Sequence, residues 1–258
     1  MIGTIVQPRT NGLGGALRRI VGDIRKIYRR GGRAVIAVPL LTAIAVLPEA
    51  AQHIVEIKLG MFDSREAFRA LANDPTRWAF GYVKLAGFWI AILGFARFHA
   101  RGALRQVPLV PPAMLLRVAI GVALGFGAGV GLDRIGAAIG VPAIGTLLTV
   151  VSFVFQTGLL LYIVAALIED RDMTLRRTFT QRFPTAALLT LYMVIAFAPA
   201  QLLHMANHRF ALGQATPVVW ALMTFDALWI GLFAALVGAA LFTGARARLT
   251  WRGWQIDC

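Results

Sequence analysis

The stretch WAFGYVKLAGFWIAILGFA (residues 78–96) decides the fold class of this chain. It lies between Arg77 and Arg97, and Lys84 is its single charged residue. The twenty steps from Arg77 to Arg97 correspond to a helix of about 30 Å, which matches the hydrocarbon thickness of a bilayer. The stretch therefore predicts a transmembrane helix.

The composition of the whole chain agrees with this interpretation. Of its 258 residues, 58% are hydrophobic and 15% are charged, and the mean hydropathy is +0.71. Soluble domains are only about half apolar. Six segments approach the length and apolarity of a span: about 34–57, 78–98, 112–132, 142–168, 184–206 and 217–243. We predict an all-α polytopic membrane protein with six transmembrane helices in a domain covering residues 34–243.

An amphipathic helix is expected before the first span, within an N-terminal segment covering residues 1–33. In GLGGALRRIVGDIRKIYRR (residues 12–30), leucines and isoleucines recur at helical spacing and basic residues fill much of the remaining surface. This pattern is typical of a helix that lies in the headgroup plane and attracts anionic lipids. We expect Gly31 and Gly32 to let the chain turn into the membrane.

Arginine and lysine are distributed unevenly between the loops. Nineteen lie on the side of the two termini and six lie on the other side, while Lys84 lies within a span. Because positively charged loops stay in the cytoplasm, we expect both termini, including a tail at residues 244–258, to be cytoplasmic. The excess of arginine over lysine, with abundant alanine and glycine, is a habit of GC-rich bacterial genomes. We therefore predict a multi-pass protein of the bacterial inner membrane.

Two classes of partner follow from these features. Membrane lipids are expected around the spans and the N-terminal helix. The net charge of +14 is divided among loops instead of forming one patch, so we expect no nucleic-acid partner. In the third span, Gly121, Gly125 and Gly129 recur every four residues, which lets helix backbones approach closely. This glycine face predicts packing within the chain or, alternatively, contact with a protein partner or a second copy.

Ionisable residues inside the spans point to function because a charge in hydrocarbon is costly. These polar residues are Glu49, His53 and Glu56 in the first span, Lys84 in the second, Gln201, His204 and His208 in the fifth, and Asp226 in the sixth. The spacing places each group of three on one helix face. Glu49 lies fifteen residues after Ala34, about 22 Å along a helix, which predicts a cluster in the outer half of the membrane.

The charges in this set are expected to pair. A lone buried lysine or aspartate would neutralise, whereas a pair stays charged. We predict an ion pair between Lys84 and Asp226, or between Lys84 and Glu49. Alternatively, Lys84 extends to the outer interface beside Trp78 and Tyr82. We assign Glu49, His53, Lys84, Gln201, His204 and Asp226 to a substrate-binding or intramembrane polar cluster.

The sequence contains few signals for catalysis or cofactors. His204 and His208, with Glu49 or Glu56, resemble a metal-ligand set, but an HxxxH spacing alone is weak evidence. A bis-histidine haem held by His53 and His204 is a second alternative. The only cysteine is Cys258, so a cysteine-held cluster is excluded. We therefore predict no enzymatic activity, no cofactor and no metal.

The first and fifth spans share a local pattern that indicates an internal repeat. Pro48 precedes His53 by five residues, as Pro199 precedes His204. If the repeat is genuine, spans one and two correspond to spans five and six, with spans three and four between or beside them.

The layout also suggests a family. A basic amphipathic helix, six spans and the loop LIEDRDMTLRRTF (residues 167–179) resemble bacterial six-span proteins similar to the membrane domain associated with glycerophosphodiester phosphodiesterases. Six-span permease subunits of exporters have a similar layout. The function itself is predicted from the ionisable residues that converge at one depth: we expect transport or lipid handling, with an outward-facing polar cavity. The alternative is a structural or assembly subunit of a larger membrane complex.

Overall fold

The computed structural model describes residues 13–247, 249–250 and 253–254. The first twelve residues of the expected N-terminal segment and the end of the expected tail lie outside the described residues. The elements are α1 (Leu13–Ala37), α2 (Pro39–Lys58), α3 (Arg65–Ala70), α4 (Pro75–Arg101), a 3-10 turn η1 (Leu104–Gln106), α5 (Pro112–Ile139), α6 (Pro142–Leu167), α7 (Leu175–Thr180), α8 (Phe183–Ala211), α9 (Thr216–Ala245), and the two-residue antiparallel strands β1 (Leu249–Thr250) and β2 (Gly253–Trp254).

The predicted fold class is confirmed. Six of the described helices, α2, α4, α5, α6, α8 and α9, are long and apolar enough to cross a membrane. The protein is therefore an all-α polytopic membrane protein. Each of these six helices has a proline in its first two positions. Proline suits this place because the first helical N–H groups have no partner within the helix.

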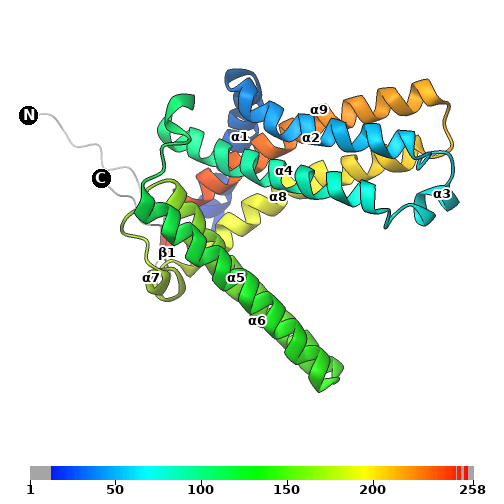
Figure 1. Cartoon of the computed structure of the whole chain (residues 1–258). Helices are drawn as coiled ribbons and strands as arrows, with labels where there is room; N and C mark the ends of the chain where they lie inside the picture. The colour runs from blue at the N-terminus through cyan, green and yellow to red at the C-terminus, as the bar shows by residue number, and fades with distance from the viewer. Residues whose placement is uncertain (1–12, 248, 251–252, 255–258) are drawn as a thin grey trace, which may run out of the picture.

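Four of the spans form one bundle. Helix α9 lies at its centre and packs against α2, α4 and α8, and α2 also packs against α4 (Figure 1). The hairpins expected to be repeats, α2–α4 and α8–α9, thus share a bundle, but they are not equivalent. Helix α8 packs against α6 in addition to α9, whereas α2 packs against α9 and α4.

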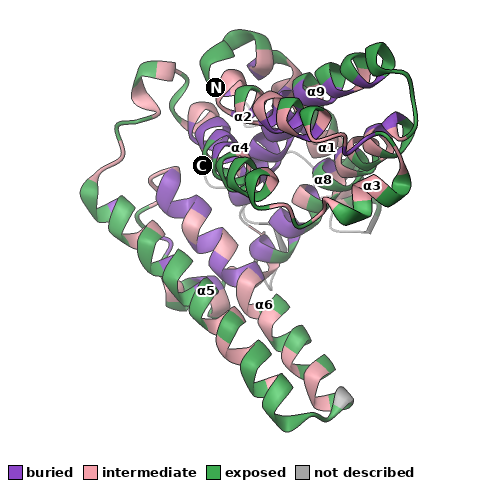
Figure 2. Ribbon diagram, turned by 45° about the vertical axis from the view of Figure 1, so that its right-hand side comes forward, coloured by how far each residue is buried: buried purple, intermediate pink, exposed green. Residues whose placement is uncertain are grey.

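Small residues of α9 allow this close packing. A Cβ atom added to Gly231 would lie 2.7 Å from Val46 Cγ2, and one added to Gly238 would lie 2.5 Å from Phe95 Cβ. From Ile230 to the end of α9, nearly every residue is buried, as Figure 2 shows for the core of the bundle. This half of the bundle is held by backbone approach and dispersion contacts.

The hairpin of α5 and α6 diverges from the bundle and meets it near one end only (Figures 1 and 2). Its two helices pack on each other through the glycine face found in the sequence. A Cβ atom at Gly121 would lie 2.6 Å from Ile163 Cγ1, and Gly125 and Gly129 face Gln156. The structure therefore uses Gly121, Gly125 and Gly129 for packing within the chain, and α6 occupies the face that we considered for a second copy.

Helix α1 runs across the bundle at the end opposite α3 (Figure 1). Its apolar face packs mainly on α9, and Tyr192 donates a hydrogen bond to Asp23 over 3.0 Å. The expected turn at Gly31 and Gly32 is wrong, because α1 continues to Ala37 and a Cβ atom at Gly31 would lie 2.9 Å from Leu236 Cα. The chain turns at Val38 instead, and the first span begins at Pro39 instead of residue 34.

Candidate functional site

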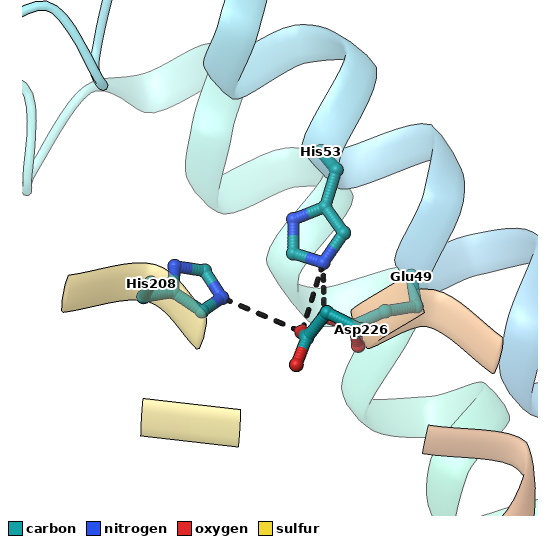
Figure 3. A group of neighbouring side chains, drawn as sticks. All are labelled: Glu49, His53, His208 and Asp226. Carbon is teal, nitrogen blue, oxygen red and sulfur yellow. Dashed lines mark hydrogen bonds and ion pairs between the residues drawn. The ribbon is translucent and has the colours of Figure 1, made fainter. Parts of the chain in front are cut away.

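Asp226 of α9 is the centre of a buried polar cluster. Its carboxylate is fully buried, and its Oδ2 atom lies 2.6 Å from His204 Nδ1 and 3.1 Å from His53 Nε2. His208 Nε2 lies 3.7 Å from the same oxygen. The other oxygen, Oδ1, accepts a hydrogen bond from Asn207 over 2.7 Å. One carboxylate thus joins α9 to both α2 and α8 (Figure 3).

Helix α2 supplies the second half of the cluster. As the spacing predicted, Glu49, His53 and Glu56 share one face, and all three are at most 2% exposed. His53 Nε2 lies 3.1 Å from Glu49 Oε1, and His53 Nδ1 lies 3.1 Å from Glu56 Oε2. With the contact to Asp226, His53 therefore touches three carboxylates.

Two cations of α4 complete the cluster. Lys84 Nζ lies 2.8 Å from Glu49 Oε1, so of the two ion pairs predicted for Lys84, the one with Glu49 forms and Asp226 is paired with histidines instead. Arg77 Nε donates to Glu56 over 2.9 Å. In the sequence, Arg77 only marks the start of the second span, because nothing there shows that the start of α4 lies against α2.

The cluster differs from the set of six residues assigned from the sequence, because it also contains Glu56, Arg77, Asn207 and His208 and does not contain Gln201. Gln201 is half-buried and makes no hydrogen bond with the described part of the chain, so it does not belong to the contacting set. Asn207, only 4% exposed, was not predicted. A signal for Asn207 was present, since it lies between His204 and His208 on α8 and one turn after His204.

Glu49 lies nearer to the middle of its helix than we expected. Because α2 begins at Pro39 and has 20 residues, Glu49 lies about 15 Å along a helix of about 30 Å. The cluster thus extends from the middle of the bundle toward the end where α3 lies. Four of its members are partly exposed: Arg77, Lys84, His204 and His208 have 20%, 25%, 13% and 15% of their side chains accessible.

The hydrogen-bond partners of His53 restrict where hydrogen can lie on its ring. A neutral imidazole has one N–H donor and one bare nitrogen, and an ionised carboxylate can only accept. Both ring nitrogens of His53 face carboxylate oxygens at 3.1 Å. A neutral His53 would therefore direct one lone pair at a carboxylate. The arrangement is satisfied when a second hydrogen, or another cation, lies between His53 Nε2 and its two carboxylate partners.

The sequence left two alternatives for a bound group, a bis-histidine haem and a metal ion, and the structure bears on them differently. Bis-histidine haem ligation by His53 and His204 is wrong, because both residues direct a nitrogen at Asp226 Oδ2, within 3.1 and 2.6 Å, which leaves no space between them for a porphyrin. Among the described residues, Glu49, His53, His208 and Asp226 form a group of histidines and carboxylates that could hold a metal ion together. This set differs from the one that the HxxxH spacing suggested.

No family model, curated protein or solved structure matches this chain.

Proposed function

We propose that this integral membrane protein is a proton-coupled carrier, and not an enzyme. In this proposal, the cluster around Asp226 gains and loses a proton while a polar or anionic group, of a solute or of a lipid headgroup, crosses the bilayer. The observation that carries the proposal is the contact of His53 with three carboxylates at membrane depth. Buried ionisable chains of this kind are typical of proton relays in transporters.

The charges of the cluster support a site that exchanges one proton. Glu49, Glu56 and Asp226 are three acids, while Lys84 and Arg77 are two cations, which contact Glu49 and Glu56. The cluster is therefore neutral when one additional proton is bound. In a medium of low dielectric constant, an uncompensated charge costs several kcal/mol. We infer that the bound proton resides mainly on His53, which lies between the acids.

Loss of that proton would weaken the contact between α2 and α9. Without the proton, the lone pair of His53 Nε2 faces the negatively charged oxygens of Asp226 and Glu49. The interaction is then repulsive instead of attractive. In the other half of the bundle, Gly231 and Gly238 hold α9 against its neighbours through close contacts with Val46 and Phe95, which do not depend on protonation. We therefore propose that deprotonation opens the bundle at the α3 end and exposes Lys84, which can then bind an anionic group.

Cysteine labelling in membrane vesicles tests this proposal. Lys84→Cys is placed in a Cys258→Ser background and treated with a membrane-impermeant thiol reagent at mildly acidic and mildly alkaline pH. We expect reaction from one side of the membrane, with a rise in rate at alkaline pH that exceeds the rise in a His53→Gln background, where only the thiol titrates. Leu202→Cys, whose side chain is largely exposed on the lipid face of α8, is the unreactive control.

Two outcomes would contradict the carrier. One is a cysteine at position 84 that does not react from either side at any pH. The other is a pH dependence that is unchanged by His53→Gln. Either result would mean that the cluster is a fixed element of packing.

A second candidate function rests on a different observation. The α5–α6 hairpin leaves the bundle at an angle, and large apolar side chains such as Phe126 and Phe153 are exposed along it. We infer that, if the carrier proposal fails, the protein is a subunit whose partner lies along this hairpin. Mild purification and native mass spectrometry distinguish the two, since a stoichiometric heterologous partner favours the subunit. The lipid-handling form of the carrier, which we expected from the polar residues converging at one depth, stays a prediction.

A further inference from the structure

Four side chains of the cluster direct one possible metal-ligand atom each toward a common point. They are Glu49 and His53 of α2, His208 of α8 and Asp226 of α9 (Figure 3). The four atoms lie within 4.8 Å of one another. Helix α2 and the distant hairpin of α8 and α9 therefore contribute to a single set of two imidazoles and two carboxylates.

The separations approach those of a tetrahedral metal site. With bonds of 2.0–2.1 Å to nitrogen and oxygen, two ligands of a tetrahedral Zn²⁺ ion lie about 3.3 Å apart. His53 Nε2 lies 3.1 Å from both Glu49 Oε1 and Asp226 Oδ2, and His208 Nε2 lies 3.7 Å from Asp226 Oδ2. Shifts of a few tenths of an ångström at these pairs, with an inward movement of His208 toward Glu49, would complete the tetrahedron.

Two buried atoms of the set have no hydrogen-bond partner in the described part of the chain. They are Oε2 of Glu49, a residue with 0% exposure, and Nε2 of His208. A buried polar atom without a partner costs about 1–3 kcal/mol, and more when it is charged. Both atoms belong to residues of the converging set. A cation between the four side chains would satisfy His208 Nε2 directly, and it would satisfy Glu49 Oε2 when the carboxylate binds through both oxygens.

The next layer of residues has the arrangement that orients metal ligands. Metal-binding histidines usually donate their second ring N–H to a carboxylate, which fixes the tautomer. His53 Nδ1 faces Glu56 at 3.1 Å, and Glu56 is held by Arg77. Donation to Glu56 leaves the Nε2 lone pair free for a metal. On the opposite side, Asn207 holds the Oδ1 atom of Asp226.

We infer that Glu49, His53, His208 and Asp226 form a binding site for a divalent transition-metal ion, with Zn²⁺ as the best match. Imidazole suits zinc, and carboxylates complete its tetrahedral sites, whereas Mg²⁺ and Ca²⁺ prefer oxygen ligands alone. The inference concerns binding and does not depend on transport. If the carrier proposal also holds, the ion and the proton of His53 compete for the same nitrogen.

Lys84 competes with a metal ion for Glu49 and so regulates metal binding at this site. Its ammonium group lies 2.8 Å from Glu49 Oε1, and its side chain is 25% exposed, so it can turn outward on its flexible stem. A zinc ion carries two positive charges, which replace the charge of Lys84 and the proton of His53. The net charge of the cluster is then unchanged, so the exchange does not leave an uncompensated charge at membrane depth.

Zinc titration of the purified full-length chain tests the inference. Untagged protein in detergent is stripped with a chelator and titrated with Zn²⁺ against a chromophoric competitor. We expect about one ion per chain, a rise in the unfolding temperature of the wild type with zinc, and, with Co²⁺, the strong visible absorption of a tetrahedral complex. The last two measurements need no variant.

Variants locate the ion. His208→Ala and Asp226→Asn are expected to lower zinc affinity by at least 100-fold, and Glu56→Gln by about 10–100-fold, the range found for residues that orient metal ligands. Lys84→Met is expected to raise it. His99→Gln, which changes another histidine with a buried, unpartnered Nε2, is the matched control and is expected to leave it unchanged.

The result that overturns the inference is wild-type protein that binds no zinc, or variants that bind zinc as well as the wild type does. This test and the labelling test have separate readouts. Zinc bound by the four residues together with an inaccessible position 84 would contradict the carrier alone, and the reverse pair of results would contradict the metal site alone.

Discussion

Tyr28 of α1 donates a hydrogen bond from its hydroxyl group to the backbone carbonyl of Ile195 in α8, over 3.2 Å. Ile195 is four residues before Pro199, which lies inside α8 and has no N–H to bond that carbonyl. In hydrocarbon, a free carbonyl must find another partner. A helix from the N-terminal segment thus satisfies a carbonyl that a proline in the fifth span leaves without its helical bond.

Removal of this hydroxyl is expected to destabilise the protein. Tyr28→Phe should lower the free energy of unfolding by about 1 kcal/mol, since it leaves the Ile195 carbonyl without its donor. Thermal unfolding in detergent measures the change. Tyr82→Phe, at an exposed tyrosine of α4, is the control and should have no effect. Equal stability of the two variants would show that the hydrogen bond contributes nothing.

The proline of α2 is accommodated by a glycine. Pro48 leaves the carbonyl of Ile44 without its helical partner, and a Cβ atom at Gly87 would lie 2.6 Å from that oxygen. Gly87→Ala should therefore separate α4 from α2 and lower stability by about 1–3 kcal/mol. Gly127→Ala is the matched control, because nothing lies within 4 Å of its added Cβ atom and alanine favours a helix. If Gly87→Ala is as stable as Gly127→Ala, the close approach is not required.

The pair of Lys84 and Glu49 predicts strong coupling between two mutations. Lys84→Met alone leaves a buried carboxylate without its cation and is expected to lower stability by about 2 kcal/mol, less than for a fully buried pair because Lys84 is partly exposed. Adding Glu49→Gln should restore most of this loss. A double-mutant cycle by thermal unfolding measures the coupling energy. Additive effects of the two mutations would argue against the pair.

The contacts of His53 predict its protonation state. In metal-free protein near neutral pH, we expect hydrogen on both ring nitrogens, because both face carboxylates. ¹⁵N magnetic resonance of labelled histidine measures this directly, with His53→Gln used to assign the signal. His99 packs beside Phe242 with no carboxylate contact among the described residues, and it should carry a single N–H. A bare nitrogen on His53 would remove the basis for a bound proton.

The orientation predicted from the loop charges can be tested with the only cysteine of the chain. If the C-terminus is cytoplasmic, a membrane-impermeant maleimide should label Cys258 in permeabilised cells and not in intact spheroplasts. Cys258→Ser is the control for background labelling. Labelling of Cys258 in intact spheroplasts would reverse the orientation.

The fold class followed directly from the sequence because its causes are local. Apolar length predicts a span wherever it occurs, so all six spans were found. The start of α2 was missed because the apolar pattern runs continuously from Ala34 across Val38, and the residue that marks the start is Pro39. The shared face of Glu49, His53 and Glu56 was also predictable, since helix periodicity alone fixes it.

The partners of those residues had a different origin. Lys84 has two acids at similar depth, and only the packing of α4 against α2 selects Glu49 over Asp226. In the same way, Asp226 contacts both His53 and His204 because α9 packs against both α2 and α8. The sequence by itself determined the spans and the faces of single helices, which depend on hydrophobic transfer and the helical repeat. Only the tertiary structure decided which faces meet, because that depends on side-chain volumes and close approaches between helices far apart in the chain.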